Sequence, residues 1–231
     1  MNMLKTSKTL TCLYAILLAV LILSVSIAVP ILFRPFYYAH IAPLELPQEM
    51  HASPAQIREA YNQVLDYCTG FSSHYASGIF PFSAQGADHF RDVRGLFLFD
   101  GVTIIISSVS MILLKIFSRF LHLTPRRIGR HGAAFWGPVY LMIGVSILSI
   151  LVSLNFSAAF TIFHHLFFPG KENWLMDEHT DPVINMLPEV FFRNCAILIG
   201  ACMIVLCVLL IFFDCKASHK KNTTSAAAQV S

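Results

Sequence analysis

The fold is decided by long apolar stretches, and the first of them, residues 9–33, reads TLTCLYAILLAVLILSVSIAVPILF. Three further stretches of this kind follow at residues 96–120, 134–163 and 191–213. An α-helix needs about 20 apolar residues to cross a hydrocarbon core about 30 Å thick. The stretches are continuously apolar rather than alternating, which favours helices over the strands of a barrel. The sequence therefore predicts an all-α membrane protein with four transmembrane helices.

The overall composition supports this interpretation. Of the 231 residues, 56% are hydrophobic and only 13% are charged, whereas a soluble domain carries about 25% charged residues. The mean hydropathy is +0.65. Residues 9–33 follow two lysines, as in a secretory signal peptide, but the apolar part of such a peptide spans only about 7 to 15 residues. We therefore interpret residues 9–33 as a retained membrane anchor.

The charged residues are divided unevenly between the segments that connect the spans. If the N-terminus is cytoplasmic, the inner segments hold one acid, Asp214, and ten bases: Lys5, Lys8, Lys115, Arg119, Arg126, Arg127, Arg130, Lys216, Lys220 and Lys221. Since Lys and Arg near helix ends are retained on the cytoplasmic side, this pattern predicts that both termini are cytoplasmic. The net charge of +3 then reflects topology, and no nucleic-acid partner is predicted.

The connecting segments complete the predicted organisation. They are a cytoplasmic N-terminus at residues 1–8, an extracytoplasmic cap at 34–95, a basic cytoplasmic loop at 121–133, an extracytoplasmic loop at 164–190 and a disordered cytoplasmic tail at 214–231. Within the cap, residues 53–56, SPAQ, have the pattern of a capping box with proline at the first helical position, so a helix is predicted at about 53–69. A second helix is predicted to begin near Ser83 and to continue into the second span. Asn155, within the third span, is expected to bond to another helix.

Several polar side chains are predicted to lie at a similar depth on the outer side of the membrane. They are His89, Arg91, Asp92 and Arg94 before the second span, His164 and His165 after the third, and Arg193 at the start of the fourth. Histidine exchanges a proton near neutrality, because its ordinary pKa is about 6.5. Asp92 lies one helical turn from His89, where a carboxylate can orient the ring. The pattern indicates a general acid–base site, although Arg and His at this depth also serve as headgroup anchors.

Two other interpretations stay open on the same residues. His89, one of the His164 and His165 pair, and Asp177 are zinc-ligand types, and such a site would indicate a metal-dependent lipid hydrolase. Adjacent histidines point about 100° apart on a helix, however, so only one of that pair would face the metal. Alternatively, the polar residues are anchors in a non-enzymatic lipid-binding or assembly factor. The chain has no glycine-rich phosphate loop and no nucleophile elbow, and we predict no cofactor and no metal.

The sequence around the histidines resembles a known family. The segment FHHLFF at 163–168, followed by Trp174, Asp181 and LPE at 187–189, is similar to the lipoprotein intramolecular transacylase family. The segment HFRDVR at 89–94, just before the second span, resembles the second signature of that family. Together with the four-span layout, the resemblance covers nearly the whole chain.

The resemblance implies an acyltransferase of the bacterial cell membrane, as in Gram-positive bacteria. Its substrate would be a lipoprotein whose N-terminal cysteine carries a diacylglyceryl group, and the sn-2 acyl chain would pass to the α-amine of that cysteine. We expect His89 and His164 to supply the general acid and base, with Asp92 orienting His89, while the role of each histidine stays open. Substrate contacts are assigned to Arg91, Arg94, His165, Trp174 and Arg193. The implied partners are diacylated lipoproteins and the surrounding membrane lipid, and the oligomeric state is not predicted.

Two positions beside the motifs differ from the family pattern. Gly86 stands where an acidic residue is expected, and Asp177-Glu178 replaces an expected Asp-Pro. Both positions lie beside the motifs rather than within them, so they bear on how the substrate fits more than on the family.

Overall fold

The computed structural model describes the backbone of residues 5–230 and the side chains of residues 5–219. The chain divides into two compact units. Unit 1 holds Met1–Ser26, Val102–Ser149 and Gly200–Ser231, and unit 2 holds Ile27–Gly101 and Ile150–Ile199. The segments predicted to be cytoplasmic all fall in unit 1, and those predicted to be extracytoplasmic all fall in unit 2.

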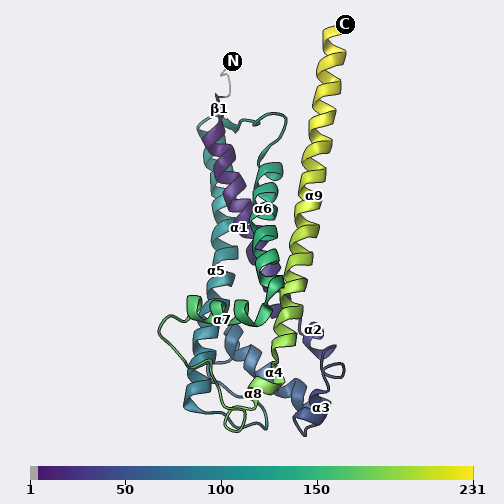
Figure 1. The fold of residues 1–231 in the computed structure, drawn as a ribbon. Helices are drawn as coiled ribbons and strands as arrows, with labels where there is room; N and C mark the ends of the chain where they lie inside the picture. Colours follow the sequence, from purple (N-terminus) through teal and green to yellow (C-terminus); the bar gives the residue numbers. More distant parts are fainter. Residues whose placement is uncertain (1–4, 231) are drawn as a thin grey trace. The chain divides into compact units, whose positions relative to one another are not determined.

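Four long helices dominate the structure. They are α1 (Lys8–Leu32), α5 (Ala84–Phe120), α6 (Ala133–Leu154) and α9 (Glu189–Val230) (Figure 1). Each contains an apolar stretch long enough to cross a membrane. Apolar side chains along them, such as Ile106, Ile147 and Val205, are more than half exposed, as expected of helices that face lipid. The predicted all-α membrane fold with four transmembrane helices is confirmed.

Unit 1 packs parts of α1, α6 and α9 around a small apolar cluster. Ile22 of α1 is buried there with Met203 and Cys207 of α9. Gly137 of α6 allows close packing, because a Cβ at that position would lie 2.6 Å from the carbonyl oxygen of Ala15 in α1. The helix–helix contact therefore depends on a small residue, as is common within membranes.

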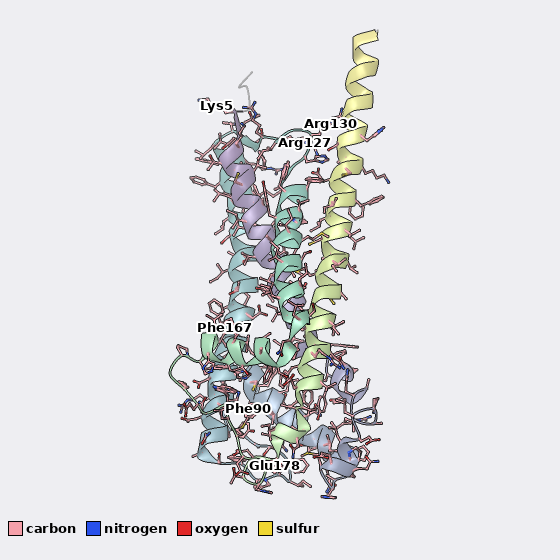
Figure 2. The ribbon with its side chains drawn as sticks, viewed as in Figure 1. Lys5, Phe90, Arg127, Arg130, Phe167 and Glu178 are labelled. Carbon is pink, nitrogen blue, oxygen red and sulfur yellow. The ribbon has the colours of Figure 1, made fainter. Side chains whose placement is uncertain are left out.

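One end of unit 1 is tied by backbone pairing and by charge. Strand β1 (Lys5–Ser7) pairs in parallel with strand β2 (Leu123–Pro125). Asp214 of α9 is buried and accepts bonds from Arg127 Nη2 (3.1 Å) and His131 Nδ1 (3.0 Å). Lys5, Arg127 and Arg130 gather at this end of the unit (Figure 2).

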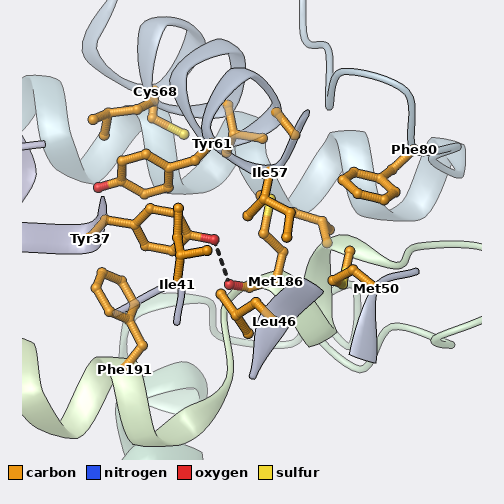
Figure 3. Close-up of a cluster of buried hydrophobic side chains, with 14 of the residues drawn as sticks. Tyr37, Ile41, Leu46, Met50, Ile57, Tyr61, Cys68, Phe80, Met186 and Phe191 are labelled. Atoms are coloured by element: carbon orange, nitrogen blue, oxygen red, sulfur yellow. Dashed lines mark hydrogen bonds between the residues drawn. The ribbon is translucent and has the colours of Figure 1, made fainter. Parts of the chain in front are cut away.

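Unit 2 contains the shorter helices and a large apolar core. The helices are α2 (Pro35–Tyr38), α3 (Leu46–Glu49), α4 (Pro54–Thr69), α7 (Phe156–Phe167) and α8 (Val183–Met186), and α2, α3, α4 and α8 contribute to the core. The predicted capping box is confirmed, because the Ser53 Oγ accepts the Gln56 amide (3.3 Å) and the Gln56 side chain accepts the Ser53 amide (2.9 Å). In the core, Tyr37 stacks on Tyr61 with ring centroids 3.7 Å apart and donates its hydroxyl to the Met186 carbonyl at 2.9 Å (Figure 3).

The third apolar stretch is not one helix, and this corrects the prediction of a span over 134–163. Helix α6 ends at Leu154, Asn155 is extended (φ −156°, ψ 97°), and α7 begins at Phe156. The Asn155 side chain accepts the Ala158 amide at 3.0 Å, so it caps α7 rather than bonding to another helix as expected. The cap therefore starts a new helix, which Figure 1 draws as the separate segment α7.

The last helix also differs from the prediction. Helix α9 continues to Val230, although residues 214–231 were expected to form a disordered tail. Extending an existing helix requires no new nucleus, and alanine and lysine, which are frequent in this segment, are favourable helix formers.

Candidate functional site

The two predicted histidine segments meet in unit 2. His89 lies in the first turns of α5, which are polar and precede the apolar part of that helix beginning at Leu96, and His164 lies near the end of α7. The two rings have centroids 5.7 Å apart and are tilted by 31°, and both side chains are buried. Phe90 and Phe167, labelled in Figure 2, belong to the same two segments. The structure thus brings together two histidines that are 75 positions apart in the sequence.

Aromatic side chains enclose the pair. The ring of Phe168 meets the edge of His89 at 5.1 Å between centroids. The ring centroid of Phe160 lies 4.4 Å from that of His164, and Trp174 stacks on His164 at 4.7 Å between centroids. Such surroundings disfavour a charged imidazole, because few polar groups are available to solvate it.

Both histidines are accordingly neutral at pH 7. Burial lowers the pKa of His89 to about 4, and neighbouring His164 lowers it as well, while Asp92 and Asn173 oppose the change. Burial also lowers the pKa of His164, against the effect of its hydrogen bond to the Phe160 carbonyl. A neutral imidazole has one unprotonated nitrogen, so each ring can accept a proton.

The position of that nitrogen is fixed in His164. Its Nδ1 lies 2.7 Å from the carbonyl oxygen of Phe160, one turn back in α7. A carbonyl oxygen only accepts, so Nδ1 carries the hydrogen and Nε2 carries the lone pair. The α7 backbone therefore presents His164 as a base through Nε2.

Asp92 does not bond directly to His89, so its carboxylate does not orient the ring by direct contact as expected. Its Oδ1 accepts from Lys171 Nζ at 2.5 Å, and its Oδ2 accepts from Asn173 Nδ2 at 2.9 Å. Partial burial works to raise the pKa of Asp92, but these bonds outweigh it and hold that pKa below its ordinary value. Asp92 is thus an ionised anchor for the segment that follows α7.

That segment, residues 168–182, is tied to the start of α5 at further points. Gln85 donates to the carbonyls of Glu172 (3.3 Å) and Leu175 (3.0 Å). The buried carboxylate of Asp181 accepts the Ser83 amide at 2.8 Å. A carboxylate at a helix N-terminus is favoured by the free amides and by the helix dipole.

Gly86 is explained by the same contact. A Cβ at this position would lie 2.1 Å from Asp181 Oδ1 and 2.9 Å from its Cγ, distances that no side chain can adopt. Asp181 also accepts the Thr180 hydroxyl at 2.8 Å. In this chain, the acid at the start of α5 comes from position 181, and position 86 must stay small to admit it.

The other predicted site residues are dispersed around the histidine pair. His165 is exposed and meets the edge of Trp174 at 5.5 Å between centroids. Arg91 is exposed and pairs with Asp88 at 3.0 Å. Arg193 is exposed on the second turn of α9.

Arg94 is engaged by the protein itself. Its Nη1 donates to the carbonyls of Tyr67 (2.6 Å) and Ser72 (2.5 Å), and its guanidinium lies over the Tyr67 ring. These contacts hold the end of α4 against α5, so we assign Arg94 a structural role.

The residues proposed for zinc do not converge. Within the part of the chain whose side chains are described, no group of three His, Cys, Asp or Glu side chains is arranged to hold a metal ion. The structure therefore gives no geometric support to a zinc centre formed by His89, His164 and Asp177.

Two residues at the site escaped the sequence analysis. Lys171 and Asn173 both contact Asp92 from the segment after α7. Nothing in their spacing relates them to Asp92, because irregular segments have no periodicity. Pro169, which cannot continue a helix, is the one local signal that α7 ends before this segment.

The sequence matches the family model described as lipoprotein intramolecular transacylase Lit over residues 12–192, well over half of the chain. The chain belongs to the Lit family. It is therefore a membrane acyltransferase by family, as the two histidine motifs indicated. The matched region of this Lit chain includes both histidines and the whole segment between α7 and α9.

Solved Lit structures have the same fold. The membrane integral lipoprotein intramolecular transacylase Lit from Bacillus cereus gives a TM-score of 0.81 at 22% identity, covering 94% of this chain and 97% of that one. A variant of that protein with one histidine replaced by arginine gives 0.77 at 21% identity, covering 94% and 93%. A histidine-to-alanine variant gives 0.75 at 21% identity, covering 92% and 94%. No curated protein sequence matches the chain.

Proposed function

We propose that this Lit-family acyltransferase moves the sn-2 acyl chain of a diacylglyceryl-cysteine lipoprotein to the α-amine of the same cysteine. The product is the lyso form, with an N-acyl group and an S-monoacylglyceryl group. The observation that carries the proposal is the pair of buried, neutral imidazoles with ring centroids 5.7 Å apart. An acyl transfer from ester to amine needs one proton removed and one proton delivered, and the pair supplies groups for both.

The first step forms the new carbon–nitrogen bond. The free amine attacks the sn-2 ester carbonyl, and the N–H proton passes to an imidazole Nε2. An α-amine with a pKa of about 7.7 to 8.0 is mostly protonated at neutral pH, so attack on the ester requires a base to accept a proton. We assign this role to His164, because the Phe160 carbonyl fixes its Nδ1–H and leaves Nε2 as an acceptor.

The second step breaks the ester carbon–oxygen bond. The tetrahedral intermediate collapses and the glyceryl oxygen leaves. The proton that His164 gained in the first step passes to His89 Nε2 and from there to the leaving oxygen, so that both imidazoles regain their neutral state. We assign His89 to the leaving oxygen, since its ring lies beside that of His164. Donor and acceptor belong to one molecule, so holding them in reacting geometry supplies much of the rate.

The surrounding residues suit the substrate. We propose that His165 and Trp174 contact the acyl-glyceryl portion, because Trp174 already stacks against His164. Arg91 and Arg193 are exposed and would stabilise the oxyanion or hold a lipid phosphate. The Arg91–Asp88 pair is a surface pair, so exchanging it for a ligand costs at most about 1 kcal/mol.

We propose that the protein lies in the bacterial cell membrane with both termini in the cytoplasm and the histidine pair at the outer leaflet. The basis is the division of charge between the connecting segments, which retains Lys and Arg inside. Mature diacylated lipoproteins carry their modified cysteine at that leaflet, so the site would meet ester and amine together.

The test uses a reporter lipoprotein expressed in a host that lacks N-acylation. Transfer within one molecule leaves the intact mass unchanged, so the N-terminal lipopeptide must be fragmented by mass spectrometry. With the wild-type chain we expect an acyl group on the cysteine nitrogen and a monoacylglyceryl thioether. His89→Ala and His164→Ala should lose this product while inserting normally. His74→Ala, an exposed histidine of the same unit, is the matched control.

Each other outcome removes the proposal. An unchanged diacylglyceryl peptide from well-expressed wild-type protein would favour a lipid-binding or assembly protein. Release of free fatty acid that a chelator stops would favour a metal-dependent hydrolase. Full activity in both histidine variants would show that the pair has no part in the chemistry.

A further inference from the structure

An amide side chain stands between Asp92 and the buried ring of His89. Asn173 Nδ2 donates to Asp92 Oδ2 at 2.9 Å, and the Asn173 side chain lies close enough to His89 to act on the pKa of that ring, which it raises. In the described part of the chain, three buried side-chain nitrogen or oxygen atoms have no hydrogen-bond partner: His89 Nδ1, Asn173 Oδ1 and the Tyr75 hydroxyl. The unpaired ring nitrogen of His89 can donate a hydrogen, and the unpaired amide oxygen of Asn173 can accept one. The two atoms are therefore complementary.

The chemistry of the groups fixes which end of the amide faces which neighbour. An ionised carboxylate only accepts, so the Asp92 side must receive the NH₂ end of the Asn173 amide. The oxygen end can only accept, so it must receive a hydrogen from the His89 ring. This arrangement places the ring hydrogen on Nδ1 and the lone pair on Nε2, because a neutral imidazole carries one hydrogen.

We propose that Asn173 is a positioning residue that holds His89 in the Nδ1–H form, and that Asp92 and Lys171 hold Asn173 in turn. The inference rests on the proposed function for its catalytic meaning, but the geometry it describes can be measured without activity. It gives His89 the same tautomer that the Phe160 carbonyl gives His164. Both rings then offer Nε2 to the substrate.

The interposed amide also explains why Asp92 leaves His89 uncharged. A carboxylate bonded directly to the ring would strongly favour the imidazolium. Asp92 holds the Asn173 amide in place, and the amide in turn orients the His89 ring. Lys171 Nζ, 2.5 Å from Asp92 Oδ1, balances the negative charge of Asp92. The ring is held in place and stays available as a neutral group.

The experiment measures the tautomer of His89 in the full chain, purified in detergent with ¹⁵N-labelled histidine. A ring nitrogen that carries a hydrogen and one that does not have well-separated ¹⁵N chemical shifts. The signals of His89 are identified as those that disappear in His89→Gln. At neutral pH, the wild type should show a protonated Nδ1 and an unprotonated Nε2. Asn173→Ala should move the population toward the Nε2–H form. It should also lower N-acylation by roughly 10- to 100-fold, less than the roughly 100- to 10,000-fold contribution of a general acid–base group itself, because Asn173 acts through His89.

Gln85→Ala is the matched control, because Gln85 tethers the same segment through the Glu172 and Leu175 carbonyls without touching His89. Gln85→Ala should leave the ¹⁵N chemical shifts of His89 unchanged. Lys171→Met, which removes the ion pair but keeps the amide, is a second perturbation in case Asn173→Ala does not fold; it should shift His89 in the same direction by less.

The outcomes are distinguishable. Unchanged His89 shifts in Asn173→Ala, or equal shifts in Gln85→Ala, would overturn the positioning role, whatever the activity. A clear tautomer change with undiminished N-acylation would overturn the catalytic meaning of the contact and the proposed role of His89 with it. A tautomer change together with lost activity, confined to Asn173→Ala and Lys171→Met, supports both.

Discussion

Gly86→Ala tests whether the segment after α7 is held by Asp181. The added Cβ would lie 2.1 Å from Asp181 Oδ1, whereas ordinary contact begins at 3.4 Å, so the carboxylate would have to retreat by about 1.3 Å, which is 3.4 minus 2.1. Asp181 is buried and bonded to the Ser83 amide at 2.8 Å, so it cannot retreat without losing this bond.

The magnitude follows from three opposing effects. Overpacking at a buried site costs about 1 to 3 kcal/mol, and the lost cap costs about 1 kcal/mol. Replacing glycine by alanine within a helix returns about 1 kcal/mol. The net expectation for Gly86→Ala is a destabilisation of about 1 to 3 kcal/mol, which for a chain of this size lowers Tm by roughly 3 to 10 °C.

The assay is thermal unfolding of the purified protein in detergent, followed together with N-acylation of the reporter. Gly95→Ala is the control on the same helix, because a Cβ there meets nothing within 4 Å, and it should leave Tm unchanged or raise it. Adding Asp181→Ala should remove the clash, so the double variant should lose less than the sum of the two single losses. A Gly86→Ala protein as stable as wild type would refute the reasoning.

Three further predictions concern stability. Because the pKa of His89 in the folded state is about 4 and that of an unfolded histidine about 6.5, the unfolded state gains the proton first as pH falls. Stability should therefore drop between pH 6.5 and 4 by up to about 3 kcal/mol, and an equally steep drop of Tm in His89→Gln would contradict this. Arg94→Met should cost about 2 kcal/mol, since the Tyr67 and Ser72 carbonyls lose a charged donor, and an unchanged Tm would argue against this bracing role. Asn155→Ala should cost about 1 kcal/mol of thermal stability and Asn155→Asp much less; equal losses would show that the side chain is not a cap.

Much of the fold follows from local patterns that the sequence displays. Four continuous apolar stretches are sufficient to predict four helices, and the residues SPAQ at 53–56 are sufficient to begin α4 at Pro54. The two histidines were predictable as a pair because each lies at the predicted outer end of a span, and the predicted topology places both ends at a similar depth.

What escaped prediction depends on tertiary context. Asn155 sits between apolar residues on both sides, and such an asparagine either bonds across helices or caps a new one; periodicity does not separate the two. The contacts of Lys171 and Asn173 with Asp92 join residues about 80 positions apart through an irregular segment. The need for glycine at position 86 becomes visible only when Asp181 is placed beside it.

The neutrality of the resting site has a consequence for the reaction's electrostatics. With both imidazoles uncharged, and with Asp92 balanced by Lys171, the histidine pair and Asp92 offer no unbalanced negative charge to an incoming ammonium group. Transferring an ammonium group into such aromatic surroundings is costly, so the proposed reaction would favour binding of the free-amine form of the substrate. In that proposed reaction, the imidazolium and the oxyanion would arise together and adjacent, and each would be the counter-ion of the other.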